Sequence, residues 1–194
     1  MDIESQNKWN NIYAGAIIGS QEVSRVLAEN EHLLPKEGRA LEIACGTASD
    51  SIFLAQHGLQ TDAWDISDAV VAKINSYAVE NKLSLSAEVR DINVQPPHDD
   101  SYDVIVLAHF LERKIVPALI NSLKPGGLIF YQTFVKDVTP SYSGPSNPAF
   151  RLEMNELLQL FPGMQLVVYR EEALIGDVSK GFRNEAMMIA RKQV

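Results

Sequence analysis

The stretch ALEIACGTASDS, residues 40–51, contains the signals that decide the fold. It begins with the apolar pattern of a buried strand, turns through Gly46 and its small neighbours, and continues into a helical pattern. In an open α/β sheet, the turn after the first strand lies at the carboxyl edge, where ligands bind. The stretch therefore predicts both the start of such a sheet and the place of its binding site.

Apolar runs alternate with helical patterns along most of the chain, which indicates βαβ units around a parallel sheet. Pro117 inside one of these helical patterns predicts a late start or a kink. Two final strand-like runs have no helical period between them and predict a hairpin with an antiparallel strand. Strands are expected at 39–44, 60–65, 83–89, 103–107, 164–170 and 184–191, and the segment 123–134 is predicted as a Pro-Gly-Gly turn that leads into a further core strand. Helices are expected at 47–57, after Ser67, and at 112–123 and 153–161.

The expected architecture is a three-layer α/β sandwich with a mostly parallel seven-stranded sheet whose last strand is antiparallel. We expect residues 1–194 to form one domain, because no internal repeat and no linker divides the chain. Residues 1–34 would form a helical cap. Residues 135–150 are rich in Pro, Ser and Gly and predict either a substrate lid or a plain connector.

The composition restricts the partners of the protein. The net charge is -8, the pI is about 5.0, and no basic run occurs, which argues against nucleic acid and anionic lipid. No apolar run reaches the roughly 18 residues of a membrane span, and the polar N-terminus is not a secretory signal, so a cytoplasmic protein is expected. The single cysteine, Cys45, excludes an internal disulfide and a cysteine-built metal site, and we interpret it as a small packed residue.

The sequence LEIACGTAS resembles the first motif of class I S-adenosylmethionine-dependent methyltransferases, in which an acidic residue precedes G-x-G-x-G. Glu42 takes the acidic place, and Ala44, Gly46 and Ala48 take the glycine places. A dinucleotide motif, G-x-G-x-x-G, fits less well, because Ala44 and Ser49 would occupy two of its three glycine places. The resemblance implies a Rossmann-like methyltransferase fold with S-adenosylmethionine as cofactor.

Further acidic residues follow at the expected strand ends. Asp65, in TDAWDIS, ends the second strand, where the resemblance implies that its carboxylate accepts hydrogen bonds from the ribose hydroxyls. Asp91, in VRDIN, matches the position that meets the adenine amino group. Both could instead be helix caps or turn residues. The turn LKPGG is also typical of the family, and the implied cofactor-binding set is completed by Ile66, Ile92, Ala108 and Phe110.

The acceptor class follows from what surrounds the fourth strand. The sequence there reads AHFL, without the [Asp/Asn/Ser]-Pro-Pro-Tyr tetrad of the branches that methylate amino groups of DNA or protein glutamine. A small-molecule acceptor is therefore expected. In KWNNIYAG, Trp9 and Tyr13 lie one helical turn apart, either as a core stripe or as a cover with aromatic rings near the sulfonium. This W-x-x-x-Y element resembles the small tellurite-resistance and thiopurine-type methyltransferases.

Methyl transfer needs alignment more than acid–base chemistry, because the methyl carbon is already activated by a positive sulfur. His109 ends the fourth strand and is the best candidate for a base, the alternative being a structural histidine. His32, His57 and His98 are predicted to lie at the surface. Contacts to the acceptor are expected from Tyr142, Phe150 and Arg151 of the loop region, and from Arg183 of the final hairpin.

Methyl transfer to a small acceptor, with S-adenosylhomocysteine as product, is thus the function that the sequence favours. Two alternatives stay open: an NAD(P)-dependent oxidoreductase, and a methyltransferase-fold binding module that transfers nothing. The loop likewise has a second interpretation, in which it is a connector anchored in the core by Phe150.

Overall fold

The computed structural model describes residues 3–194, which build one mixed sheet in the strand order β3-β2-β1-β4-β5-β7-β6. The first five strands are parallel to one another, whereas β7 is antiparallel to both β5 and β6. This arrangement confirms the predicted fold class. The strands are β1 (Arg39–Ile43), β2 (Gln60–Asp65), β3 (Leu85–Val89), β4 (Tyr102–Ala108), β5 (Leu123–Phe134), β6 (Gln165–Glu171) and β7 (Glu185–Arg191).

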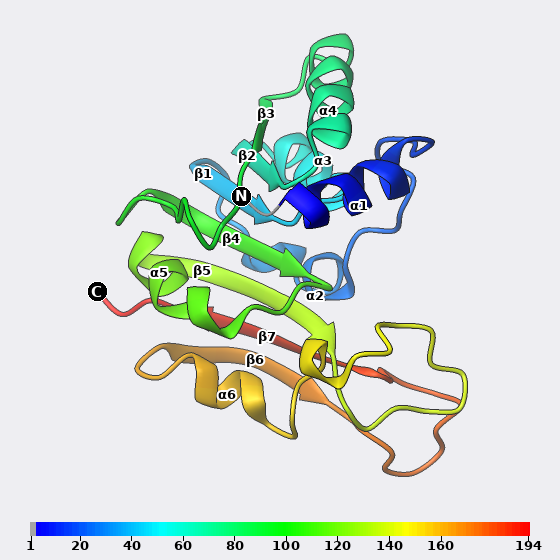
Figure 1. Ribbon diagram of the computed structural model, residues 1–194. Coiled ribbons are helices and arrows are strands. Elements are labelled where there is room, and N and C mark those ends of the chain that lie inside the picture. The colour runs from blue at the N-terminus through cyan, green and yellow to red at the C-terminus, as the bar shows by residue number, and fades with distance from the viewer. Residues whose placement is uncertain (1–2) are drawn as a thin grey trace.

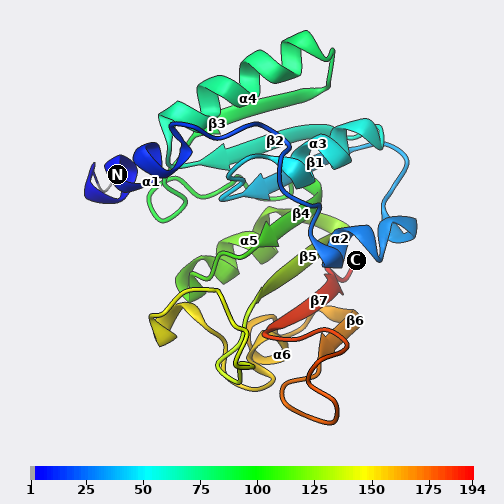
Figure 2. The same ribbon diagram turned by 90° about the vertical axis from the view of Figure 1, so that its right-hand side faces the viewer.

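Helices cover both faces of the sheet, as Figures 1 and 2 show. Side chains alternate along each strand, so that Ile105 and Leu107 of β4 face the helices α5 and α6, whereas Val104 and Val106 face α2 and α3. The helices are α1 (Ile3–Tyr13), α2 (Arg25–Ala28), α3 (Ser49–Gln56), α4 (Asp68–Glu80), α5 (Val116–Ser122) and α6 (Glu156–Leu160), with short 3₁₀ turns η1 (Glu31–Leu33), η2 (Arg113–Ile115) and η3 (Pro148–Phe150).

Local sequence signals account for several boundaries. The Ser67 hydroxyl accepts a hydrogen bond from the Val70 amide at 3.3 Å and caps α4, as predicted. Pro117 lies in the first turn of α5, so the helix starts late and is not kinked. Cys45 is buried and packs with Ile52 of α3, which confirms it as a packed residue.

The sequence predicts that LKPGG forms a turn before the fifth strand. In the structure the segment is instead part of β5. The register between β4 and β5 passes from Tyr102↔Leu123 to Val104↔Leu128, so the segment forms a bulge. A Cβ atom on Gly127 would lie only 3.0 Å from the Lys124 carbonyl oxygen and 3.1 Å from that of Tyr102. Glycine is therefore required where the bulged chain runs against its neighbour.

Two loops lie side by side beyond the carboxyl end of β5, as both views show (Figures 1 and 2). One is the irregular segment 135–150, and the other, 172–184, joins β6 to β7. The Asn184 side chain accepts a hydrogen bond from the Thr139 amide at 2.7 Å and links the two loops. Within residues 3–194, none of the helices combines the length and apolar character that crossing a bilayer requires.

Candidate active site

The turn after β1 has the backbone of a glycine motif although two of its residues are alanine. Ala44, Gly46 and Ala48 have φ angles of 55°, 52° and 61°, all in the left-handed region. This conformation is strained by roughly 1–2 kcal/mol for a residue with a Cβ atom. The three places that the resemblance assigns to glycine thus all have a conformation that favours glycine, and Ala44 and Ala48 bear the strain.

Asp65 binds this turn directly. Its Oδ2 accepts a hydrogen bond from the Gly46 amide at 3.0 Å, and its Oδ1 accepts one from the Ser67 amide at 2.9 Å. The residue is only 5% exposed, and burial raises the pKa of its carboxyl despite these hydrogen bonds. A carboxylate offers about four acceptor positions, so it can still accept from a further donor.

Glu42 is buried and joins β1 to α3. Its Oε2 accepts hydrogen bonds from the backbone amide of Ser51, at 2.7 Å, and from the Ser51 hydroxyl. Burial, followed by the nearby charge of Asp50, raises the pKa of Glu42 well above its ordinary value. The carboxyl group is therefore a fixed part of the turn's support and not a solvated surface charge.

The N-terminal helix covers the turn. A Cβ atom on Gly46 would lie 3.0 Å from the Tyr13 hydroxyl, and burial, followed by the charge of Asp65, raises the pKa of Tyr13. Trp9 stacks on Tyr13 with ring centroids 5.6 Å apart, as their spacing predicts. No residue of α1 within 3–13 is buried, but Tyr13 packs partly buried against the core cluster of α3 and α4, so the end of the helix both touches the core and lies over the turn. We call this helix the cover of the turn.

Polar contacts hold this cover in place on α4. The Asn10 side chain accepts a hydrogen bond from the Ser67 hydroxyl at 2.6 Å. The Lys73 ammonium donates to the carbonyl oxygens of Tyr13, at 3.0 Å, and Ala14, at 2.6 Å. These carbonyls belong to the end of α1, so Lys73 fixes the helix end beside the turn.

The remaining predicted cofactor residues lie at neighbouring strand ends. Asp91 follows β3, beside the end of β2, and its Oδ1 accepts a hydrogen bond from the Asn93 amide at 3.1 Å. Ile92 is buried in the core with Trp64. The other members of the predicted set follow β2 and β4: Ile66 is partly exposed after Asp65, Ala108 is the last residue of β4, and Phe110 packs on the core.

His109 immediately follows β4 and has a left-handed φ of 58°. Its Nε2 lies 3.2 Å from Oε1 of Glu185, and its ring stacks on Phe134 with centroids 4.9 Å apart. Burial lowers the pKa of His109, but the hydrogen bond and charge of Glu185 raise it by more, so the net shift is upward. The other three histidines, His32, His57 and His98, are exposed, as predicted.

A cavity of about 220 Å³ opens beside His109. Sequence reasoning missed five of its polar residues, Glu22, Ser24, Arg25, Gln132 and Glu185. Gln132 had a readable signal, since an amide inside an otherwise apolar strand needs a partner. Glu185 had none, because its place depends on the antiparallel pairing of Phe134 with Glu185. The lining residues are Glu22, Val23, Ser24, Arg25, His109, Gln132, Phe182, Arg183 and Glu185.

The predicted acceptor residues divide into two groups. Tyr142 packs edge-on against Phe134, with centroids 5.9 Å apart, and the Arg151 guanidinium lies 5.5 Å from the Tyr142 ring centroid. These two residues therefore extend the aromatic stack that begins at His109. Phe150 is 53% exposed, so the interpretation as a connector that Phe150 anchors in the core is wrong.

Arg183 lines the cavity, but its guanidinium is already engaged. It donates hydrogen bonds to the carbonyl oxygens of Ala173, Asp177 and Lys180 at 2.9, 3.1 and 2.6 Å. These bonds fix the loop 172–184 behind the cavity. The sequence alone could not place Arg183, and it could not show that backbone carbonyls occupy the side chain.

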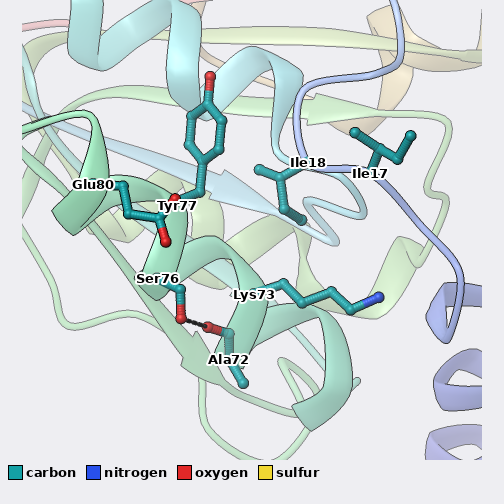
Figure 3. Close-up of a pocket in the computed structure, with 7 residues that line it drawn as sticks. All are labelled: Ile17, Ile18, Ala72, Lys73, Ser76, Tyr77 and Glu80. Atoms are coloured by element: carbon teal, nitrogen blue, oxygen red, sulfur yellow. Dashed lines mark hydrogen bonds between the residues drawn. The ribbon is translucent and has the colours of Figure 1, made fainter.

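A larger hollow of about 420 Å³ lies elsewhere, between residues 17–18 and the outer face of α4 (Figure 3). Ile17 and Ile18 border it on one side, and Ala72, Ser76 and Tyr77 on the other. Its lining includes none of the predicted site residues. Of the predicted site residues, His109 and Arg183 line the smaller cavity instead.

The sheet with its reversed β7, the turn of left-handed residues and the aspartate bound to it define the fold of class I S-adenosylmethionine-dependent methyltransferases. Residues 7–189 match the family model described as "Tellurite resistance protein TehB". The chain belongs to this TehB family, which confirms the resemblance found in the sequence.

Individual proteins support the assignment. The "Probable S-adenosyl-L-methionine-dependent methyltransferase TehB" of Haemophilus influenzae is 27% identical over 170 residues, which are 80% of this chain and 57% of that protein. This chain thus spans little more than half of that relative. The crystal structure of TehB from H. influenzae has a TM-score of 0.67 at 22% identity, covering 95% of this chain and 67% of the other.

The fold also occurs in proteins of different chemistry. The crystal structure of the [4+2]-cyclase SpnF has a TM-score of 0.69 at 18% identity, covering 97% of this chain and 92% of the other. Likeness at such identity concerns the fold alone. The function must be argued from the site.

Proposed function

We propose that this chain binds S-adenosylmethionine over the turn 44–48 and transfers its methyl group to a small-molecule acceptor, releasing S-adenosylhomocysteine. The observation that carries the proposal is the hydrogen bond from the Gly46 amide to Asp65, in a chain of the TehB family. It places a buried carboxylate with spare acceptor positions at the edge of a left-handed turn. Both features suit a ribose diol beside a closely approaching ligand.

The residues present fit the cofactor. Asp65 would accept the ribose hydroxyls, Asp91 the adenine amino group, and the Ile92 amide would donate to the ring. Ala44 and Gly46 would let the methionine part approach the backbone, while Trp9 and Tyr13 of the cover would place aromatic rings near the positive sulfur. Glu42 supports the turn from below. The set is completed by Ile66, Ala108 and Phe110 at the strand ends.

The cofactor supplies a methyl group already activated by a sulfonium, so the chain mainly holds the acceptor in line. Alignment of this kind supplies roughly 7–11 kcal/mol of the barrier. The cavity beside His109 is the proposed acceptor site, with residues 135–150 as its lid and Tyr142 and Arg151 on the lid's inner side. Of the expected cap, residues 1–34, this proposal assigns the covering role to α1, because Val26 and Leu27 of α2 are buried in the core. The net charge of -8 supports a small molecule over nucleic acid.

Calorimetric titration with S-adenosylhomocysteine tests the cofactor site. We expect a dissociation constant in the micromolar range, and at least a tenfold loss of affinity in Asp65→Ala. Asp68→Ala is the matched control, since Asp68 is exposed one residue beyond Ser67 and has no part in the site. Circular dichroism shows whether each variant is folded. Absence of binding to the folded wild type at millimolar ligand would contradict the proposal.

A binding module without transfer is the second candidate. Two observations favour it: alanine at two glycine places of the turn, and the likeness in fold to a [4+2]-cyclase. The discriminating measurement is S-adenosylhomocysteine release with a panel of thiols, phenols, amines and oxyanions. Cofactor binding without any release would establish this module. The oxidoreductase alternative requires instead that NADH, and not S-adenosylhomocysteine, protects the chain from thermal unfolding.

A further inference from the structure

Three contacts fix the ring of His109 at the wall of the 220 Å³ cavity. The backbone amide of His109 donates to the Gln132 carbonyl at 2.9 Å, the ring lies on Phe134, and Nε2 meets Glu185 at 3.2 Å. The residue bears a left-handed backbone in spite of its side chain, with φ at 58°. Strain of this kind, about 1–3 kcal/mol, persists where the surroundings over-determine the conformation, and it is frequent at functional sites.

Glu185 is itself held in place. Its Oε1 faces His109, and its Oε2 accepts a hydrogen bond from the Gln132 amide nitrogen. The other side-chain atom of Gln132, Oε1, accepts from the Val26 amide at 2.7 Å, which fixes the orientation of the amide group. A row of contacts thus runs from α2 through β5 and β7 to the imidazole, leaving Nδ1 as the ring atom free to meet a ligand.

We propose that Glu185 is a positioning residue that holds His109 as a proton acceptor, and that the acceptor substrate is therefore a small molecule carrying a proton on its nucleophilic atom, a phenol or an alcohol. The inference rests on the proposed methyl transfer and adds the class of acceptor. In this step the acceptor oxygen forms a bond to the methyl carbon. The carbon–sulfur bond breaks with its electron pair going to sulfur, and the oxygen's proton goes to Nδ1 of His109.

The charges around the cavity support a neutral acceptor over an oxyanion. Among the cavity-lining residues that the structure describes, the arginines are engaged: Arg25 binds Glu29 at 2.7 Å, and Arg183 binds loop carbonyls. Arg151 lies further away, over the Tyr142 ring. An oxyanion would thus find its cationic partners occupied.

The groups that remain available near His109 are neutral or acidic. The buried Asp50, whose Oδ1 takes the Ser24 amide at 2.7 Å, has no partner for Oδ2, and the Ser24 hydroxyl has none either. Glu22 adds an exposed carboxylate at the cavity rim. The charges of Glu185 and Asp50 also favour the imidazolium that forms when His109 takes up the proton.

Titration of the His109 ring by NMR tests the pair. Removing the charge in Glu185→Gln should make the imidazolium about tenfold more acidic, because an opposite charge in contact stabilises it. Glu185→Asp, which keeps the charge, should recover part of the change, and Glu22→Gln, in the same cavity, should leave the titration unaltered. An unchanged His109 titration in a folded Glu185→Gln would overturn the proposal.

Methyl-transfer rates test the acceptor class, with catechol as the protonated probe and tellurite as the oxyanion. We expect catechol to be methylated, with a rate about 100-fold lower in His109→Gln and about tenfold lower in Glu185→Gln. In Glu185→Gln the acidic limb of the pH–rate profile should move to lower pH. Wild-type preference for tellurite, or equal rates of Glu185→Gln and wild type on catechol, would contradict the inference.

Binding of S-adenosylhomocysteine, measured on the same variants, should stay within twofold of the wild type. Loss of that binding in the wild type would count against the proposed function and not against the pair.

Discussion

The amide of Gly46 donates a hydrogen bond to Oδ2 of Asp65 at 3.0 Å, which joins the turn after β1 to the end of the neighbouring strand β2. Since Ser67 donates to the other carboxylate oxygen, both oxygens accept from backbone amides. An asparagine at position 65 has one acceptor oxygen and would leave one buried amide without a partner. We expect Asp65→Asn to lower the free energy of unfolding by about 1–3 kcal/mol, measured by urea denaturation. Asp68→Asn, exposed at the start of α4, should change it little.

Replacing the two left-handed alanines of the turn should stabilise the protein, whereas Asp65→Asn should destabilise it. Glycine relieves the strain of this conformation, but it also increases the entropy of the unfolded chain. We expect Ala44→Gly and Ala48→Gly each to raise the free energy of unfolding by about 0.5–1 kcal/mol and to retain S-adenosylhomocysteine binding. Ala72→Gly, in the exposed middle of α4, should instead lower it by a similar amount. Destabilisation by both turn variants would show that the alanines are not strained.

Gly46 is required for its conformation and for its contact with the cover. Alanine at this position would meet the left-handed φ of 52° and place a Cβ atom 3.0 Å from the Tyr13 hydroxyl. We expect Gly46→Ala to lower the free energy of unfolding by about 1–2 kcal/mol. Adding Tyr13→Phe removes the hydroxyl oxygen and should restore the part of the free energy of unfolding that is lost through the contact between Cβ and this oxygen. A strictly additive double mutant, in a double-mutant cycle, would contradict the approach of α1 to the turn.

The site was readable from the sequence where it depends on parallel strand ends. Because such ends meet at one edge, the positions of Gly46 and Asp65 next to strands β1 and β2 were enough to bring them together. Contacts set by the antiparallel register of β5 and β7 were not readable, since a shift of the pairing would remove Glu185 from His109. The partners of individual side chains, such as the carbonyl oxygens that accept hydrogen bonds from Arg183, depend on loop geometry that no local sequence pattern specifies.

Glu42 makes the stability depend on pH. Burial raises its folded-state pKa well above the ordinary value of 4.5, so its contribution is fully present below that value and is lost as pH rises through the folded pKa. Glu42→Gln cannot ionise and keeps an oxygen for Ser51. We expect the variant to become more stable relative to the wild type as the pH is raised from acid to neutral. Urea denaturation across this range measures it, with Glu80→Gln on the exposed end of α4 as the control.

Arg113 anchors the end of the proposed lid. Its guanidinium binds both carboxylate oxygens of Glu156, at 2.5 and 2.9 Å, and donates to the carbonyl oxygens of Ala149 and Arg151 at 2.9 and 3.2 Å. These bonds connect the segment after β4 to the turn η3 and to the residue that follows it. The pKa of Glu156 is lowered chiefly by its hydrogen bond to Arg113, so the carboxylate is held in its charged form.

Removing this anchor should free the lid and leave the cofactor site intact. The pair is partly exposed, so we expect Arg113→Ala to reduce the free energy of local opening by about 1–2 kcal/mol. Chymotrypsin should then cleave at the exposed Phe150 about tenfold faster, because the rate follows the open population when reclosing is fast. Lys114→Ala, one residue away and exposed, is the matched control. Since Arg113 contacts neither Gly46 nor Asp65, S-adenosylhomocysteine affinity should stay within twofold, and a larger loss would show that the lid end supports the cofactor turn.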